Sequence, residues 1–393
     1  MRAKPLDGIK VLDLSRLLPG ALCTQHLADM GADVLKIEDP GLGDYSRWIK
    51  PLMKVHSGFF LTVSRNKRAM KLDLKKPEGK EIFSRLARDA DVVFESFRPG
   101  VVDRLGIGYD DVCKINPRIV YCSLSGYGQD GPYRDRAGHD VNYCSYAGVT
   151  EQTGEWECGP ALLNFQIADL TGGSLSSAMG ILAALVDQQR TGKGRYVDVS
   201  MTDCTLAHAV ITLARMGIDG TPRARGDDYL TGGIPSYGIY ETADNRFVSL
   251  GALEPKFWNA FCAAIDRTDL ADCGETWGDE GRAIRAQLET IFKSQPQDYW
   301  AKLGERVDCC LAPVLSLRES IDNEQIQARG MFVTDQHPTD GEVLQFAFPI
   351  KFSEFEFSID RSAPLHGEHT EQVLTSLGYD DGEIKQMRGS GVI

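Results

Sequence analysis

Short apolar strands and amphipathic helices alternate through the first half of this chain. Strands are expected at 9–13, 32–38, 91–95, 118–123 and 195–200, and helices at 20–30 and 77–88. Parallel strands need crossover connections, which helices usually provide, whereas antiparallel neighbours are joined by short turns. The alternation therefore predicts an α/β fold that contains a parallel sheet.

The pattern changes near Arg223, where the breaker cluster 232–235 precedes two apolar segments. These segments, 237–241 and 246–250, flank Ala243-Asp244-Asn245 and predict a hairpin. Helical patterns follow at 255–266, 280–294 and 297–305, and the tail contains a strand-like segment at 346–352 and short helices from about 369 and 381. We expect a large domain at 1–224, a smaller α/β domain at 225–330, and a segment 331–393 that returns to the large domain.

Charge and cysteine usage narrow the cellular setting. The formal net charge of -13 argues against nucleic acid as the main partner, because a phosphate backbone attracts basic proteins. The ten cysteines show no CxxC pairs and no metal-ligand spacing, which is typical of reduced thiols. The N-terminus lacks an apolar signal core, and the apolar stretch 175–186 is too short to span a bilayer. We expect a cytoplasmic protein without a membrane partner.

Several common sites are missing from the sequence. The junction between the first strand and its helix, 14–20, contains one glycine, so it lacks the G-x-G-x-x-G fingerprint of NAD-binding proteins. The segment His366-Gly367-Glu368-His369 has two histidines but no second cluster of ligands, so we expect no metal site. The chain also has no P-loop, no G-x-S-x-G elbow and no cysteine nucleophile motif.

Asp169 is the most informative residue of the chain. No charged residue occurs between Asp169 and Asp187, so the helix between them is expected to be buried on nearly all sides. Asp169 would lie at its entrance, where the helix dipole favours an anion and two following glycines allow a ligand to approach. A carboxylate there could act as a nucleophile or a proton acceptor. The alternative is an ordinary N-cap, since aspartate is a preferred capping residue.

His139 and Glu254 are two further candidates. His139 follows the glycine-rich loop 125–132, and loops at the carboxyl ends of parallel strands collect ligands. Its side chain suits proton transfer near neutral pH, although a single loop histidine is more often structural. Glu254 lies between a strand and a helix opened by Pro255, where an N-cap is the simpler interpretation. Sequence spacing alone does not show that these residues meet.

A basic segment offers a place for an anionic ligand. Residues 64–76 carry six basic side chains against one acid, Asp73, and Lys36 and Arg98 add positive charge near predicted strand ends. Arginine and lysine form strong charge-assisted hydrogen bonds with phosphates. A solvated basic face is the alternative.

The chain resembles the family that contains α-methylacyl-CoA racemases and family III, formyl-CoA type, CoA-transferases. The resemblance covers nearly the whole chain, and its clearest segments are 14–40, 66–68, 97–100, 125–129, 169–173, 191–194, 251–255 and 367–370. It implies an interlocked homodimer, with a Rossmann-like large domain built from both chain ends and a small domain. It places each active site between the large domain of one subunit and the small domain of the other.

The resemblance also implies the chemistry. The substrate is an acyl-CoA, and no further cofactor is expected. The residues expected to bind CoA are Arg16, Lys36, Arg65, Lys67, Arg68, Arg98, Tyr127, Gly128 and Gln129. In racemases of the family, a histidine supported by a glutamate faces an aspartate across the substrate α-carbon, which matches His139, Glu254 and Asp169. Backbone N–H groups beside Asp169 or its glycines would hold the thioester enolate. In transferases the same aspartate is a nucleophile that forms an acyl-aspartyl anhydride and then an aspartyl-CoA thioester.

The motifs favour the racemase without excluding the transferase. The runs 137–143 and 251–255 resemble the racemases, whereas the basic stretch 65–68 and the longer segment 44–63 resemble the transferases. Gly232-Gly233 could serve as the mobile glycine loop of a transferase. We therefore expect a 2-methylacyl-CoA racemase, with a family III CoA-transferase as the alternative and a non-catalytic acyl-CoA-binding protein as a third possibility.

Overall fold

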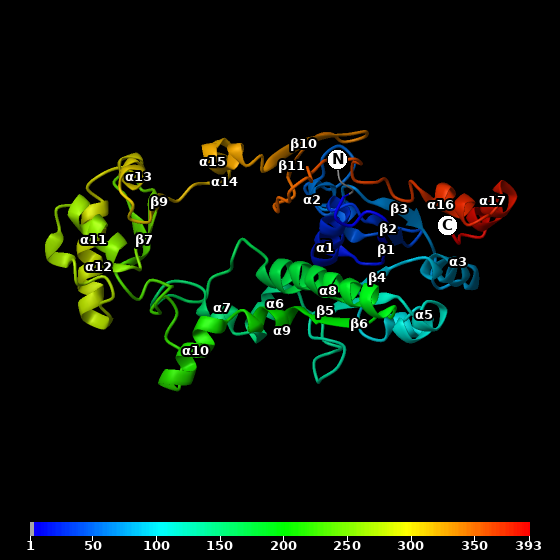
Figure 1. Ribbon diagram of the computed structural model, residues 1–393, viewed down its shortest axis with the longest axis horizontal. Helices are drawn as coiled ribbons and strands as arrows, with labels where there is room; N and C mark the ends of the chain where they lie inside the picture. Colours follow the sequence, from blue (N-terminus) through cyan, green and yellow to red (C-terminus); the bar gives the residue numbers. More distant parts are fainter. Residues whose placement is uncertain (1–3) are drawn as a thin grey trace. The chain divides into compact units, whose positions relative to one another are not determined.

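The computed structural model describes residues 4–393 and forms two compact units (Figure 1). The first unit contains the chain up to Ala147, Asn164–His208 and Gln325–Ile393. The second contains Gly148–Leu163 and Ala209–Glu324. Each unit has a hydrophobic core of its own.

The first unit is built around a six-stranded parallel sheet in the order β3-β2-β1-β4-β5-β6. Its strands are β1 (Lys10–Asp13), β2 (Asp33–Glu38), β3 (Arg68–Lys71), β4 (Val92–Glu95), β5 (Val120–Ser125) and β6 (Tyr196–Ser200). Val11 of β1 pairs with both Val34 of β2 and Val92 of β4. The predicted parallel sheet is confirmed, and its strand order is that of dinucleotide-binding folds. We did not predict β3, because its basic end residues enclose only two buried positions.

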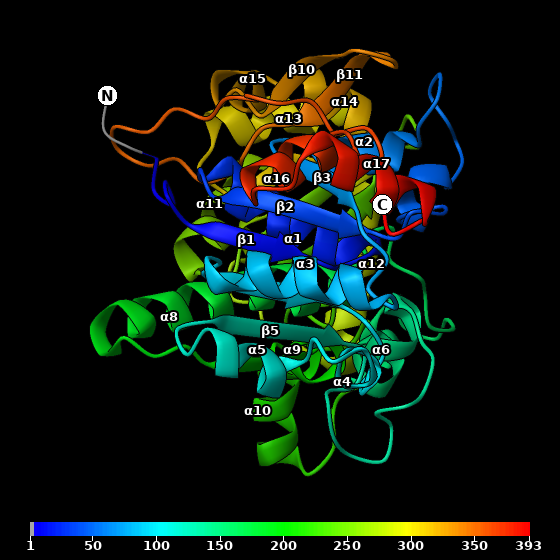
Figure 2. The same cartoon turned by 90° about the vertical axis from the view of Figure 1, so that its right-hand side faces the viewer.

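Helices pack on both faces of this sheet. The core on one face is formed with α3 (Pro77–Arg88), α4 (Val101–Leu105), α5 (Tyr109–Ile115), α16 (Thr370–Ser376) and α17 (Asp381–Gly389). Figure 2 shows α3, α16 and α17 in front of the strands and α1 (Leu17–Asp29) behind them. The helix α8 (Ser176–Thr191) packs on β5 and β6. The last two helices of the chain therefore complete the core that the N-terminal half begins.

One long helix carries Asp169. A π-helical segment, η2 (Ala168–Leu175), continues directly into α8. The expectation of burial on nearly all sides is wrong, because Leu175, Met179 and Val186 are 51%, 69% and 57% exposed. The expectation that the apolar stretch is too short for a bilayer is also wrong by length, since Ala168–Thr191 is long and apolar enough to cross a membrane. That property is weak evidence, because core helices of soluble proteins share it.

The C-terminal part of the first unit contains a hairpin of β10 (Phe332–His337) and β11 (Gly341–Phe346). The short helix α2 (Gly58–Thr62) packs on β11. The strand expected at 346–352 is wrong, because the ladder stops at Phe346 and Pro349, which cannot donate a ladder hydrogen bond, follows soon after. The remaining elements of this unit are η1 (Tyr45–Trp48), α6 (Asp140–Tyr146), α9 (Met201–Ala207) and, at its boundary, α15 (Glu324–Ala328).

The second unit contains an antiparallel sheet of β7 (Tyr237–Glu241), β8 (Phe247–Gly251) and β9 (Leu311–Pro313). The predicted hairpin is confirmed, and helices occupy the three segments where they were expected. Trp258, Phe261 and Phe292 are fully buried between sheet and helices. The helices of this unit are α7 (Val149–Gln152), α10 (Val210–Asp219), α11 (Pro255–Ala264), η3 (Thr268–Leu270), α12 (Gly278–Phe292), α13 (Gln297–Arg306) and α14 (Leu317–Asp322).

The second unit also includes two segments that the expected boundary at 224/225 assigned to the large domain. The Arg225 side chain donates to the Cys158 carbonyl at 2.8 Å. The Arg282 guanidinium lies 4.3 Å from the centroid of the Trp156 ring. These contacts attach residues 148–163 to the second unit, although a long stretch of the first unit separates them in the sequence.

Candidate active site

The carboxyl ends of the parallel strands meet at one edge of the first unit. The strand order reverses between the neighbours β1 and β4, and ligands of open α/β sheets bind beside such a switch point. The loops that follow β1, β4 and β5 contain Arg16, Arg98 and Tyr127. The fold therefore brings three residues expected to bind CoA to the same edge of the sheet.

Arg16 has a defined position at this edge. Its Nη1 donates to the Tyr45 hydroxyl at 2.6 Å, and its Nη2 lies 3.5 Å from the Asp39 carboxylate. Its guanidinium lies 5.1 Å from the centroid of the Tyr45 ring and 5.4 Å from that of Phe97. The side chain remains 32% exposed. A partly exposed guanidinium held between two rings is well prepared to bind a phosphate.

Three other basic residues of the expected CoA set lie in the interior. Lys36 pairs with Asp44, Arg65 with Asp29 and Lys67 with Asp13, at N···O distances of 2.8, 2.8 and 3.5 Å. Burial lowers the pKa of Lys67 to about 8. These pairs join the sheet to α1 and to the loop before η1, so Arg65 and Lys67 are not part of a solvated face, whereas Lys75 of the same basic segment is exposed. Their contact with CoA stays a prediction.

Arg68 and Arg98 differ from these buried residues. Arg68 forms a two-point pair with the Asp33 carboxylate at 2.9 and 2.7 Å, and its side chain is 20% exposed. Arg98 is exposed in the loop that follows β4. Of the basic residues expected to bind CoA, Arg16 and Arg98 are therefore the two that combine solvent access with a place at the switch point.

The loop after β5 holds the last three residues of the expected CoA set. The Gly128 N–H donates to Ser125 Oγ at 2.9 Å, and the Gln129 N–H donates to the Asp198 carboxylate at 3.1 Å. Gly128 has a φ of +88°, which favours glycine. Gln129 Nε2 is buried without a hydrogen-bond partner within residues 4–393. An unpaired buried donor suits a polar ligand group.

Asp169 lies in the first turn of η2 rather than at the N-cap position, which Ile167 occupies. The capping interpretation is therefore wrong for this residue. The two glycines of the motif serve close packing: a Cβ at Gly172 would lie 2.7 Å from the Met201 carbonyl oxygen, and one at Gly173 would lie 2.9 Å from Pro19 Cβ. They allow η2 to contact α9 and α1 tightly, which fixes the helix that carries Asp169.

The surroundings of Asp169 favour its protonated form. Burial, together with the nearby negative charge of Asp140, raises the pKa of Asp169 to about 7. Asp140 Oδ1 accepts hydrogen bonds from the Ala168 and Asp169 N–H groups at 2.8 and 3.1 Å. These two amides thus already have an acceptor, and which amides beside Asp169 or its glycines hold the enolate stays a prediction. A carboxyl group that titrates near neutral pH is suited to both giving and accepting a proton.

His139 is connected to the Asp169 segment through its neighbour in sequence, Asp140. It is the exposed N-cap residue of α6, and its N–H donates to Asn142 Oδ1 at 3.0 Å. The next residue, Asp140, binds the backbone of Asp169. Tyr143 of the same helix donates to the Gly138 carbonyl at 2.5 Å, and burial together with the Asp169 charge raises the pKa of Tyr143. The structure therefore brings His139 and Asp169 to the same end of α6.

Glu254 belongs to the second unit. It precedes α11 at the N-cap position, its side chain is exposed, and it makes no capping hydrogen bond within that described helix. An exposed carboxylate without a capping role is free to bind elsewhere. Its meeting with His139 stays a prediction.

The second unit also contains a cavity of about 1200 Å³. Its wall includes Gly232, Gly233 and Gly251, the last of which begins the segment leading to Glu254. Gly232 and Gly233 therefore line this cavity, which is compatible with the expected role of the pair as a mobile loop.

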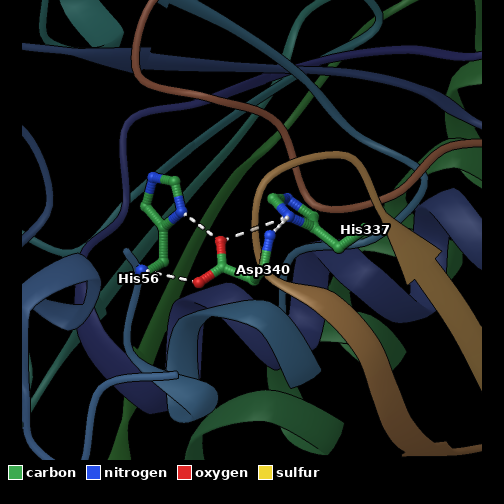
Figure 3. A group of neighbouring side chains, drawn as sticks. All are labelled: His56, His337 and Asp340. Carbon is green, nitrogen blue, oxygen red and sulfur yellow. Dashed lines mark hydrogen bonds and ion pairs between the residues drawn. The ribbon is translucent and has the colours of Figure 1, made fainter. Parts of the chain in front are cut away.

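His56, His337 and Asp340 form a buried group that offers metal-ligand atoms within 4.8 Å of one another (Figure 3). His56 Nδ1 lies 2.8 Å from Asp340 Oδ2. His337 Nε2 donates to the Ala363 carbonyl at 2.9 Å, which leaves Nδ1 to accept from the Asp340 N–H at 3.2 Å. These hydrogen bonds join the segment before α2, which contains His56, to the β10–β11 hairpin, which contains His337 and Asp340.

The comparisons identify the family. The family model for CoA-transferase family III matches residues 6–370. The chain belongs to CoA-transferase family III. It is 33% identical over 390 residues to the α-methylacyl-CoA racemase of Homo sapiens, a match that covers 99% of this chain and 97% of that protein. It is also 33% identical over 397 residues to the succinyl-CoA:glutarate CoA-transferase of Mus musculus, covering 99% of this chain and 90% of that protein.

The fold agrees with this family. The crystal structure of a CaiB/BaiF family protein from Brucella suis has a TM-score of 0.82 and 29% sequence identity, and the match covers 96% of this chain and 100% of that chain. A racemase and a transferase are equally similar in sequence to the present family III chain. Family membership therefore identifies an enzyme of the racemase and CoA-transferase group and leaves the reaction to be inferred from the site.

Two parts of this family III site were not expected from the sequence. From the sequence, Asp140 beside His139 could orient a ring or cap the next helix; in the structure it holds the backbone of Asp169. The partners of Arg16, Tyr45 and Asp39, lie in the segments 44–63 and 14–40, which carry the resemblance, but neither residue was expected to contact Arg16. The acid immediately after His139 was the available signal for the first, and no local signal existed for the second.

Proposed function

We propose that this protein is a 2-methylacyl-CoA racemase in which Asp169 and His139 exchange protons with the substrate α-carbon. The observation that carries the proposal is a partly buried carboxyl group with a pKa of about 7 beside a histidine-bearing helix. Asp169 can hold or release a proton near neutral pH, and histidine is the side chain that most often transfers protons in catalysis; a two-sided proton transfer requires two such groups. With a pKa of about 7, Asp169 keeps a protonated fraction at neutral pH that can donate a proton, whereas only its ionised fraction could attack as a nucleophile.

The reaction balances with these two groups. Neutral His139 takes the C2 proton, the C2–H electron pair moves into the thioester carbonyl, and an enolate forms. Protonated Asp169 then gives its proton to the opposite face of C2, and the carbonyl re-forms. The enzyme is left with a protonated His139 and an ionised Asp169, which is the state that accepts the other enantiomer. Glu254, brought by a second subunit, would stabilise the imidazolium.

CoA would bind along the switch point of the sheet. Arg16 and Arg98 would contact the phosphates, and the loop Tyr127-Gly128-Gln129 would contact the part of CoA nearer the thioester. The partly exposed guanidinium of Arg16 and the unpaired Nε2 of Gln129 support this assignment. CoA enters as part of the substrate, and no separate cofactor or metal takes part in the proposed steps.

A homodimer is part of the proposal. In α10, Val210, Leu213 and Ile218 are 59%, 64% and 80% exposed, and the helix has no buried residue. The apolar stripe of α8 is exposed as well. Uncovered apolar surface of this kind usually marks an interface. Light scattering at micromolar concentration should give twice the mass of the 43.3 kDa chain, whereas a monomer would contradict the proposal. The ten free cysteines are compatible with a cytoplasmic enzyme.

The test uses one enantiomer of a 2-methylacyl-CoA in D₂O without any free acid. We expect deuterium at C2 together with loss of optical purity. Retention of the C2 proton and of optical purity would refute the racemase.

CoA transfer is the second candidate, supported by the equally similar transferase relative and by the glycine pair beside the second-unit cavity. Ionised Asp169 would then attack the thioester carbonyl and release CoA as its thiolate. Hydroxylamine added with an acyl-CoA should in that case trap Asp169 as a hydroxamate, which mass spectrometry detects on the peptide containing residue 169. An unmodified peptide and no formation of succinyl-CoA from added succinate would exclude this candidate.

A further inference from the structure

Asp140 connects α6 to the helix that carries Asp169. Its Oδ1 accepts from two consecutive amides, Ala168 and Asp169, at 2.8 and 3.1 Å. These amides belong to the first turn of a helix and have no partner within the helix itself. A single carboxylate oxygen therefore fixes the position and direction of the first turn of η2.

Few charges act on Asp169 within the described chain. Asp140 is the charged neighbour on α6, and Tyr143 and Cys144 of the same helix are the other titratable groups whose pKa responds to Asp169. The facing elements α1 and α9 present uncharged groups to η2, namely Pro19, Met201 and Thr205. Asp140 thus provides both the hydrogen-bond acceptor and the neighbouring charge.

We infer that Asp140 is a positioning residue that fixes the Asp169 backbone and keeps a negative charge beside the Asp169 carboxyl group. The functional part of this inference rests on the proposed function, in which Asp169 must hold a proton at neutral pH. In this role Asp140 acts through Asp169 and not directly on the substrate. Its two effects are separable, because an asparagine keeps the acceptor oxygen and removes the charge, whereas an alanine removes both.

The first measurement follows Asp169 directly and needs no activity. A carbodiimide with glycine ethyl ester modifies protonated carboxyl groups, and peptide mass spectrometry reports the modification of Asp169 at each pH. In the wild type, modification should fall with a midpoint near pH 7. In Asp140→Asn the midpoint should move down by about one pH unit, because the like charge is gone. The control Asp203→Asn, an exposed acid in the first turn of α9, should leave the midpoint unchanged.

The second measurement compares the pH profile of kcat/KM for α-proton exchange. The acid limb of Asp140→Asn should move in the same direction as its modification midpoint. Asp140→Ala should in addition increase amide hydrogen exchange at residues 168–171, an effect that Asp140→Asn should largely avoid. An unchanged midpoint in a folded Asp140→Asn variant overturns the inference, even if the wild type exchanges the α-proton. If the midpoint shifts in Asp140→Asn but the wild type exchanges no α-proton, the inference about Asp140 holds and the proposed function is refuted.

Discussion

Replacing Arg16 by alanine separates the binding role of this side chain from its structural role. Its contacts with Tyr45 and Asp39 are partly exposed, and such contacts contribute roughly 0–1 kcal/mol to stability. A charge-assisted hydrogen bond to a phosphate contributes about 1.5–3 kcal/mol. At about 1.4 kcal/mol for each factor of ten, loss of one such bond weakens binding roughly 10- to 150-fold.

Isothermal titration with CoA measures this effect. We expect Arg16→Ala to raise the Kd of CoA by at least tenfold, with a smaller increase at high salt because exposed charges are screened. The unfolding midpoint without CoA should change little. Arg190→Ala is the matched control, since Arg190 is exposed in the last turn of α8, just before the amino end of β6. A change below twofold for Arg16→Ala, or an equal change for Arg190→Ala, would refute the assignment of the CoA site.

Three further predictions concern the proposed proton transfer and the first unit. One direction of the racemisation needs ionised Asp169, whose pKa is about 7. In that direction, kcat/KM for α-proton exchange should fall about tenfold per pH unit below pH 7. A flat profile from pH 5 to 8 would contradict this prediction. His139→Ala should reduce exchange at least 100-fold with CoA affinity unchanged, whereas His208→Ala, which alters another exposed histidine, should do neither. Asp340→Ala should lower the free energy of unfolding, measured by urea denaturation, by about 3–5 kcal/mol. The control Asp135→Ala, at an exposed acid, should lower it by about 0.5 kcal/mol or less. Equal effects of the two substitutions would argue against a stabilising role of the buried hydrogen bonds of Asp340.

The pH dependence of the Asp340 contribution has a definite sign. Burial alone would raise the pKa of Asp340, but hydrogen bonds from the His56 side chain and from the Val55 and His56 N–H groups lower it below the usual range. The resulting stabilisation is therefore present above the unfolded pKa of about 3.9 and is lost as the pH falls toward the folded value. The difference between wild type and Asp340→Ala should accordingly shrink in acid.

The sheet and most helices could be predicted because their signals are local. The helix α3 begins at Pro77 as expected, since proline suits the first helical turn, and strands buried on both faces appear as continuous apolar runs. The strand β3 was missed because Arg68 and Lys71 at its ends suggested a phosphate site. The hairpin β10–β11 was not predicted, because the sequence alone does not show that residues 332–337 and 341–346 pair with each other.

The site was predicted in its residues more than in its geometry. The sequence offered Asp169 and His139 as candidates without showing that they meet, and the role of Asp140 depends on a contact 29 residues away. The burial of Lys36 and Lys67 depends on partners in other elements, which sequence spacing does not reveal. A charge pattern indicates where basic residues lie along the chain and not whether tertiary packing has already paired them.

The most direct test of the account compares wild type with Asp169→Asn in D₂O, using each enantiomer of a 2-methylacyl-CoA separately and no acceptor acid. Asparagine keeps the size of the side chain but cannot transfer the proton. We predict that wild type incorporates deuterium at C2 and racemises both enantiomers, and that Asp169→Asn binds CoA normally but racemises neither. Racemisation by Asp169→Asn at the wild-type rate would contradict the central role of Asp169.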